Sequence, residues 1–193
     1  MARVAHPIEI ESYKILRARV DLSHLPPLSR AVAERVCHAS ADLSFATSLI
    51  LDEDALRAGR AALRAGAPVY ADARMVAAGV TSRDVAVPLT DPRVPGLARR
   101  LRTTRSAAAM GLAAAEAPPG AVWVVGNAPT ALTALLETPP RAPALIVGLP
   151  VGFVGAAEAK AALAASGLPA VANRGERGGS AVAVATLNAL LYA

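Results

Sequence analysis

The stretch V-W-V-V-G-N-A-P-T-A-L, from Val122 to Leu132, constrains the fold more than any other part of the chain. Four apolar residues end at Gly126, and Pro129 opens a helix-prone run. We interpret this as a buried strand, a tight turn and a helix start, because glycine permits close backbone approach and proline suits the first helical turn. The first N–H groups of such a helix lack partners within it. The turn is therefore predicted to present Gly126 and Asn127 to the anionic oxygens of a ligand.

Strand and helix patterns alternate along the rest of the chain. Strands are predicted at 67–70, 122–125, 144–147 and 169–171, with a strand or sheet edge at 85–89. Helices are predicted at 8–20, 29–38 with Ser29 as N-cap, 52–65 with Asp52 as N-cap, 72–79, 97–116, 130–136, 156–165 and 180–191. This alternation favours parallel strands covered by helices on both faces. We therefore expect an α/β fold of three layers, α/β/α, with a doubly wound and mostly parallel sheet, in a single domain over residues 1–193. Ligands are expected beyond the carboxyl ends of the strands.

Composition narrows the class of protein. Hydrophobic residues make up 54% of the chain and charged residues 18%, which excludes a disordered composition. Charges interrupt the apolar runs before any reaches about 20 residues, so no membrane span is expected. The first eleven residues contain acids and no apolar signal core, and the single cysteine, Cys37, excludes an internal disulfide framework. Together these features favour the cytoplasm.

The basic balance leaves three kinds of partner open. A net charge of +5 and a sequence pI of about 10.1 suit nucleic acid, an acidic small molecule or only a soluble surface. The densest basic run, R-R-L-R-T-T-R from Arg99 to Arg105, contains no aromatic residue. Nucleic-acid binders usually add stacking aromatics or a dense basic stripe. We therefore expect no nucleic-acid partner, although this hypothesis is kept as an alternative.

Generic catalytic motifs are missing from the sequence. It contains no G-x-x-x-x-G-K-[ST], no G-x-G-x-x-G after a strand and no G-x-S-x-G. The three histidines, His6, His24 and His38, are not spaced as paired metal ligands. Phosphate hydrolysis, dinucleotide redox chemistry and serine hydrolysis are therefore disfavoured, and no metal site is indicated.

His38 is the candidate acid, in R-V-C-H-A-S-A-D at a predicted helix end. It either caps the helix, favoured by the helix dipole, or takes part in chemistry. Ser40 and Asp42 follow it closely and Arg35 precedes it by about one helical turn. An acid beside the imidazole would fix its tautomer and let it hold a proton for donation.

Two further clusters are candidate anion sites. The run from Thr103 to Ser106 is either a solvated helix face or a carboxylate clamp, in which hydroxyls complete the shell around Arg105. The run R-G-E-R-G-G-S, residues 174–180, places glycine N–H groups before a helix. Such a nest binds anions, here supplemented by Arg177.

Several blocks in order resemble one family. They are R-V-C-H-A-S-A-D at 35–42, D-A-R-M-V-A-A-G at 72–79, T-R-S-A at 104–107, G-N-A-P-T-A-L at 126–132, P-V-G-F-V at 150–154 and G-G-S at 178–180. With them, the chain resembles the precorrin-8X methylmutases, also called cobalt-precorrin-8 methylmutases, of corrin (cobalamin) biosynthesis. The resemblance runs from about Ser12 to Leu190.

The resemblance implies an isomerase that moves a methyl group from C11 to C12 of precorrin-8X or cobalt-precorrin-8. The product would be hydrogenobyrinate or cobyrinate, formed without a metal, nucleotide or external methyl donor. The family's catalytic histidine falls on His38, as a proton donor. The implied substrate contacts are Ser12, Arg17, Thr104, Arg105, Gly126, Asn127, Arg177, Gly178, Gly179 and Ser180. Family members are homodimers with pockets near the subunit interface.

Four positions depart from the family's usual pattern: Ala41, Ala159, Glu176 and Arg19. Ala41 stands where glycine is frequent, and this change affects the turn beside His38. The charges at Glu176 and Arg19 affect recognition of the substrate's arms more than the class of reaction. Two alternatives to the isomerase remain. One is a non-catalytic corrinoid carrier on the same fold, and the other is the basic nucleic-acid-associated protein.

Overall fold

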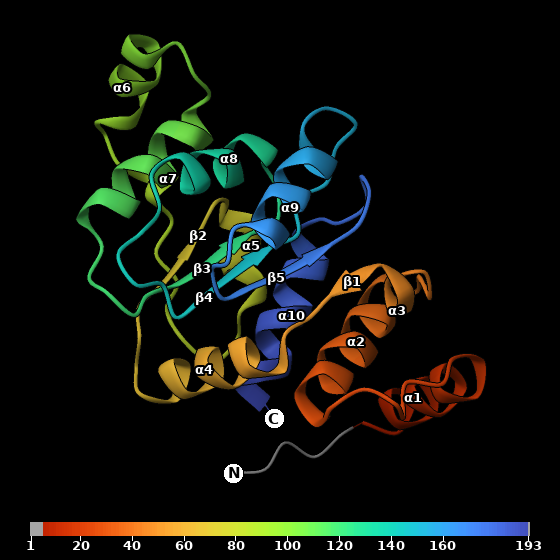
Figure 1. The fold of residues 1–193 in the computed structure, drawn as a ribbon. Helices are drawn as coiled ribbons and strands as arrows, with labels where there is room; N and C mark the ends of the chain where they lie inside the picture. Colours follow the sequence, from red (N-terminus) through yellow and green to blue (C-terminus); the bar gives the residue numbers. More distant parts are fainter. Residues whose placement is uncertain (1–5, 193) are drawn as a thin grey trace.

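In a computed structural model, residues 6–192 are described and build one sheet of five strands between helices (Figure 1). The strands are β1 (Leu49–Ile50), β2 (Val69–Ala71), β3 (Val122–Val125), β4 (Leu145–Gly148) and β5 (Ala170–Asn173). Their order is β1-β5-β4-β3-β2, in which β2 to β5 are parallel and the edge strand β1 pairs antiparallel with β5. The predicted mostly parallel sheet is confirmed.

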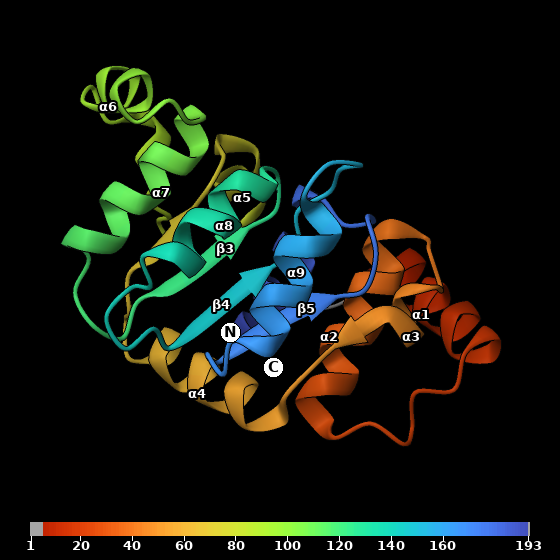
Figure 2. The same cartoon turned by 45° about the horizontal axis from the view of Figure 1, so that its top comes forward.

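Helices cover both faces of the sheet, as Figures 1 and 2 show from two directions. Those described are α1 (Pro7–Arg19), α2 (Pro27–Ser40), α3 (Phe45–Ser48), α4 (Glu53–Arg64), α5 (Arg74–Gly79), the 3-10 turn η1 (Pro88–Thr90), α6 (Val94–Leu101), α7 (Arg105–Glu116), α8 (Pro129–Glu137), α9 (Ala156–Ala165) and α10 (Ser180–Tyr192). Helices α7, α8 and α9 pack on one face, and α2, α4, α5 and α10 on the other. The three-layer prediction is confirmed. Within residues 6–192, no helix combines the length and apolar character needed to cross a membrane.

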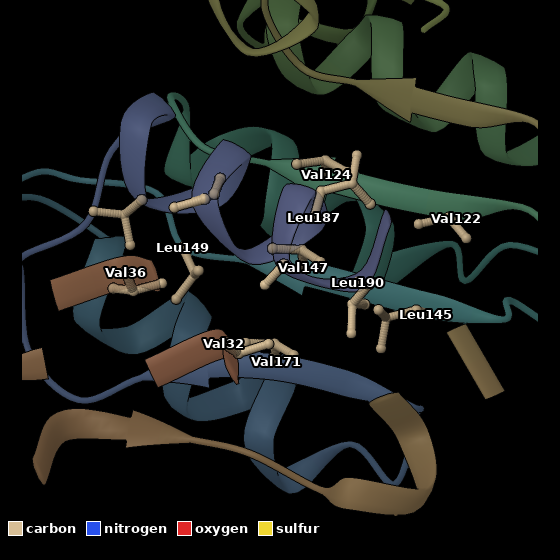
Figure 3. Close-up of a cluster of buried hydrophobic side chains, with 14 of the residues drawn as sticks. Val32, Val36, Val122, Val124, Leu145, Val147, Leu149, Val171, Leu187 and Leu190 are labelled. Carbon is tan, nitrogen blue, oxygen red and sulfur yellow. The ribbon is translucent and has the colours of Figure 1, made fainter. Parts of the chain in front are cut away.

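The central strand β3 shows why the sheet is covered twice. Successive side chains of a strand point to opposite faces. Val122 and Val124 belong to the hydrophobic core under α10, where Leu187 joins them (Figure 3). Trp123 and Val125 belong to the core under α7 and α8. All four strand residues are buried, so the apolar run 122–125 reflects burial on both sides of the sheet.

One predicted helix is wrong in form, and the strand or sheet edge predicted at 85–89 is confirmed only as a single bridge to the edge strand β2. The run 97–116 is two helices, because Arg102 adopts a left-handed backbone with φ of 51° and Thr104 caps α7 by accepting the Ala107 N–H. Figure 1 shows α6 projecting from the body of the molecule. The run 85–89 contributes an isolated bridge between Tyr70 and Ala86 and then passes into η1. Helix propensity continued across 97–116 and concealed the break.

The start of α2 also differs from its prediction. The helix begins at Pro27 and carries Ser29 inside its first turn, buried. Its first N–H groups are capped from another helix, because Glu53 accepts from the backbone of Leu28 and Ser29. The predicted N-cap at Asp52 is confirmed, since its carboxylate accepts from Asp54 and Ala55.

Candidate active site

The polar turns that follow the parallel strands meet at one edge of the sheet, as the sequence predicts. Asp72 follows β2, Gly126 follows β3 and Arg174 follows β5. A side chain on Gly126 would lie 3.0 Å from the backbone of Ser180, at the start of α10. The carboxyl ends of the strands therefore bring the Gly126 turn and the beginning of α10 into contact.

The Gly126 turn holds a carboxylate of the chain itself. Asp72, buried, accepts from the backbone N–H groups of Gly126 at 3.0 Å, Asn127 at 2.9 Å and Ala128 at 2.7 Å. Burial raises the pKa of Asp72, whereas these three donors act to lower it. The prediction that these N–H groups are open to a ligand is wrong in this structure. A substrate contact at Gly126 or the exposed Asn127 stays a prediction that requires other atoms of these residues.

A pocket of about 780 Å³ lies between α1, α2, α5 and α10. It brings together Ser12, His38 and Ser180, which lie far apart in the sequence. Much of the remaining wall is apolar, from Ile8, Met75, Ala181, Val184 and Ala185. Local sequence patterns do not predict that these residues meet, because α1 reaches the site only by packing against α2 (Figure 2).

His38 is held from α1. Its Nδ1 atom lies 2.9 Å from the Ser12 hydroxyl oxygen, and the two share a hydrogen bond. The Tyr13 ring stacks on the imidazole, with centroids 4.6 Å apart and an angle of 14° between the planes. The imidazole is half-buried and lines the pocket. One ring nitrogen is therefore engaged and the ring plane is fixed by a second contact.

The acid beside His38 in sequence is not its partner in space. Asp42 accepts from the Arg177 guanidinium and from the Ser44 N–H. The Ser44 hydrogen bonds, with Arg177, hold the pKa of Asp42 below its usual range. Ser40 turns back to the carbonyl of its own helix. The prediction that these residues orient the imidazole is wrong, because α2 ends beyond His38 and the chain reverses there.

The residue at which the chain reverses is Ala41, with a left-handed φ of 53°. Glycine adopts this conformation without steric cost, whereas a Cβ atom makes it strained. This explains physically why glycine suits the position. The departure noted at Ala41 therefore costs local stability and leaves His38 in place.

Two polar atoms of the pocket lack a partner. Among the described residues, three buried side-chain polar atoms have none: Trp123 Nε1, Ser180 Oγ and Asn188 Oδ1. Ser180 and Asn188 both line the His38 pocket, and the Asn188 amide nitrogen is already used by the Gly79 carbonyl. Because buried polar groups are normally satisfied, this pair indicates a ligand that supplies the missing hydrogen bonds.

Of the predicted substrate contacts, Ser12 and Ser180 line this pocket, whereas the others, including the cations Arg17, Arg105 and Arg177, lie outside its walls. Arg17 donates twice to Glu34, at 2.9 and 2.7 Å, and borders a neighbouring cavity of about 270 Å³. Arg105 is exposed, and in the described part of the chain it forms no ion pair or hydrogen bond through its side chain. Thr104 caps α7 and contacts the Thr130 hydroxyl at 2.7 Å.

The glycines before α10 are needed for backbone packing. A Cβ on Gly178 would lie 2.4 Å from the Leu149 carbonyl oxygen, and the Gly179 N–H donates to the same oxygen at 2.8 Å. Beneath this loop, the buried Lys160 donates to Asn173 at 3.1 Å and to the Arg177 carbonyl. Burial lowers the pKa of Lys160 to about 8. The hydrogen bonds of Lys160 therefore support the glycine loop before α10. The departure from the family pattern at Ala159 leaves these hydrogen bonds intact.

Sequence reasoning noted Arg35 beside His38 but missed Tyr13 and Asn188. Tyr13, Arg35 and Asn188 contact His38 or line its pocket. Arg35 and His38 lie three residues apart on α2, a spacing that places two side chains on one helix face. Tyr13 and Asn188 sit on different helices, so only tertiary packing reveals them. No group of three or more histidine, cysteine or acidic residues among residues 6–192 is placed to hold a metal ion.

The fold and site define a class: a three-layer α/β protein whose candidate active site is a largely apolar pocket with one oriented imidazole. The profile of the precorrin-8X methylmutase family matches residues 7–193. The chain therefore belongs to the precorrin-8X methylmutase family, which consists of isomerases of cobalamin biosynthesis.

Individual relatives agree with this assignment. The chain is 47% identical to a precorrin-8X methylmutase of Pseudomonas aeruginosa, over 93% of this chain and 91% of the relative. It is 42% identical to a cobalt-precorrin-8 methylmutase of Salmonella typhimurium, over 96% and 93%. A crystal structure of precorrin-8X methylmutase from Thermus thermophilus superimposes with a TM-score of 0.85 at 38% identity, covering 95% of this chain and 93% of that one.

Proposed function

We propose that the His38 pocket binds precorrin-8X or cobalt-precorrin-8 and that His38 donates the proton that eases migration of a methyl group from C11 to C12. The bond between the methyl carbon and C11 breaks as the bond to C12 forms, and the proton returns to His38 at the end. Substrate and product, hydrogenobyrinate or cobyrinate, are isomers, so the reaction requires no cofactor or external methyl donor. The observation that carries the proposal is the oriented imidazole of His38 at the pocket wall.

Ser12 supports this role by its contact with Nδ1. When the Ser12 hydroxyl donates to Nδ1, the neutral imidazole carries its proton on Nε2. In that arrangement Nε2 is the ring nitrogen left to exchange a proton with the substrate. The substrate-binding role predicted for Ser12 is therefore extended to include orientation of the acid.

The macrocycle's carboxylate arms require cations and backbone donors. Arg105 is available, because no acid of residues 6–192 pairs with it. Arg17 and Arg177 would exchange Glu34 and Asp42 for the carboxylates of the substrate. Ser180 offers an unpaired hydroxyl inside the pocket. Thr104, Asn127, Gly178 and Gly179 complete the proposed set around the carboxyl edge of the sheet.

The proposal includes a homodimer in the cytoplasm without a nucleic-acid partner. The loop after β4 supports a subunit contact, because Phe153 and Val154 expose 91% and 87% of their surface. Light scattering of the purified protein should give about twice the chain mass. The protein should bind neither duplex nor single-stranded DNA at about 0.1 M salt. A protein that does bind nucleic acid would still show measurable affinity at this salt concentration through its phosphate contacts.

The direct test is turnover by the purified protein without a methyl donor, nucleotide or added metal. The substrate carries a ¹³C label in the C11 methyl group, and the reaction is followed by absorbance and NMR. We expect the labelled methyl signal to move from the C11 to the C12 position. A corrinoid carrier would bind the macrocycle and leave the label at C11, and that result would overturn the proposed isomerase.

A further inference from the structure

Lys160, on α9, is a buried cation that takes no part in the proposed reaction. Its side chain is 0% exposed, and within residues 6–192 it is the only lysine or arginine that is buried. Helix α9 packs on the face of the sheet opposite α10, and Lys160 does not line the His38 pocket (Figure 2). Any effect of Lys160 on the substrate must therefore be exerted through other residues.

The Lys160 ammonium closes the start of the loop that leads from β5 to α10. It donates to the Asn173 side-chain oxygen at 3.1 Å and to the Arg177 carbonyl. The Asn173 amide nitrogen donates to the same Arg177 carbonyl at 2.9 Å and to the Arg174 carbonyl at 3.1 Å. Two buried side chains thus converge on the backbone of Arg177 and fix it against the end of β5.

The residues that follow in this loop reach the proposed active site. Ser180 begins α10 three residues after Arg177, and its hydroxyl, which has no partner among residues 6–192, lies in the wall of the His38 pocket. On the other side, the Arg177 guanidinium donates to Asp42 and Ser44, just after the end of α2. The position of the Arg177 backbone therefore sets where Ser180 lies relative to His38.

Stability alone does not account for a lysine at this position. A buried charge costs free energy unless it is paired, and within residues 6–192 no ion pair joins Lys160 to a carboxylate. Burial lowers the pKa of Lys160 to about 8, although the charge of Glu176 acts in the opposite direction. An apolar side chain of similar length would fill the same space without this cost. A cation retained in spite of the cost indicates a role in function.

We infer that Lys160 is a positioning residue, which holds the loop 174–180 so that the Ser180 hydroxyl meets the bound macrocycle. This inference rests on the proposed function. Without Lys160, one of the two side-chain donors to the Arg177 carbonyl is lost, and the loop gains freedom that substrate binding must then remove. Because Ser180 holds the macrocycle before and during methyl migration alike, the loss falls on binding more than on the chemical step.

The experiment compares Lys160→Met with Leu163→Ala, a change at a buried apolar position of the same helix. We expect Lys160→Met to raise KM and the dissociation constant of hydrogenobyrinate about 10-fold, the equivalent of one hydrogen bond to the ligand, and to change kcat less than about twofold. Its midpoint of urea unfolding at pH 7 should equal that of the wild type, because relief of the buried charge offsets the lost hydrogen bonds. Leu163→Ala should show the reverse pattern, with a lower midpoint because of the cavity and a wild-type KM.

A second arm tests whether Lys160 acts through Ser180. In Ser180→Ala the hydroxyl is already absent, so the addition of Lys160→Met should raise KM by less than about threefold, since both changes remove the same interaction. A full rise of about 10-fold in that background would show that Lys160 does not act through Ser180, and the inference would be wrong.

The role of Lys160 and the proposed function fail separately. In an enzyme that turns over, a wild-type KM for Lys160→Met would overturn the role of Lys160 and leave the isomerase intact. A Lys160→Met protein that does not fold, or that loses as much stability as Leu163→Ala, would make Lys160 a structural residue and would also overturn its positioning role. A wild-type protein that binds hydrogenobyrinate without turnover would overturn the proposed function. In that case, an unchanged dissociation constant for Lys160→Met would also refute the positioning role, and a rise of about 10-fold would support it.

Discussion

The Gly126 turn and the His38 pocket are neighbours that differ in how their polar groups are satisfied. At the turn, three backbone donors converge on the buried carboxylate of Asp72. In the pocket, Ser180 Oγ and Asn188 Oδ1 have no hydrogen-bond partner among residues 6–192. A set of converging donors is therefore a structural device when the chain supplies the anion, and a binding site only where the chain leaves groups unsatisfied.

The largest expected effect on stability tests the Gly126 turn, whose donors bind Asp72. Asp72→Ala removes the acceptor of three backbone N–H groups, and each buried donor left unsatisfied costs about 1–3 kcal/mol. We expect the free energy of unfolding in urea to fall by at least about 3 kcal/mol on this basis. The control is Asp52→Ala, which removes an exposed helix cap worth about 1 kcal/mol. Equal losses in the two variants would show that the turn does not depend on its internal carboxylate.

A smaller effect tests the buried support of the loop between the two regions. Burial lowers the pKa of Lys160 to about 8, below its unfolded value of about 10.4. Between these values the unfolded chain binds more protons, so Lys160 destabilises the fold below pH 8 and this penalty is relieved as the pH rises toward 10. From pH 7.5 to 10, the wild type should gain about 2–3 kcal/mol relative to Lys160→Met, since one pKa unit is worth about 1.4 kcal/mol.

Urea unfolding of both proteins at several pH values measures that difference. The asparagine and the carbonyl that Lys160 contacts keep their positions in both states of the lysine, because a neutral amine still donates two hydrogen bonds. If the free energy of unfolding changes with pH in the same way for both proteins, the charged form of Lys160 is not destabilised by burial and the prediction is wrong.

The open pocket is tested through Tyr13. Tyr13→Leu removes the ring stacked on His38, whereas Tyr13→Phe keeps it. Aromatic pairs contribute about 0.5–1.5 kcal/mol, so kcat should fall about 10-fold in the leucine variant and change less than about twofold in the phenylalanine variant. KM should change little in either. Equal kcat values for both variants would remove Tyr13 from the machinery that orients His38.

The smallest expected effect concerns the turn after His38. Ala41→Gly should raise the free energy of unfolding by up to about 1 kcal/mol, because it relieves a left-handed backbone. Ala31→Gly, within α2, should instead lower it by about 1 kcal/mol. Thermal unfolding of both variants decides the point, and a loss of stability in Ala41→Gly would mean that the reversal is not strained.

Most of the fold followed from patterns that are local in sequence. The apolar runs at 122–125 and 144–147 indicated buried parallel strands, and Asp52 marked the start of α4. The break at Arg102 escaped prediction because the residues around it favour helix. The edge strand β1 is two residues long, so it carries no periodic signal.

The site was only partly predictable for the same reason. His38 stood out because histidine is the side-chain type best suited to acid–base chemistry and the chain has three of them. Its partners did not, because Ser12 and Tyr13 come from a helix 26 and 25 residues away in sequence and the nearer Asp42 is taken by Arg177. The backbone geometry of the Gly126 turn was predicted correctly, but its N–H groups are not open to a ligand. They bind Asp72, which lies 54 residues earlier and was not linked to the turn by any local pattern.

The central claim is that the His38 pocket performs the isomerisation, and it is tested most directly by turnover of His38→Ala beside His24→Ala. His24 is exposed in the segment between α1 and α2 and serves as the control. We expect His38→Ala to lose about 10²- to 10⁴-fold in kcat while it retains product binding and thermal stability, because general acid catalysis contributes that much. His24→Ala should equal the wild type. A His38→Ala protein that converts substrate within about twofold of the wild-type rate would contradict the account.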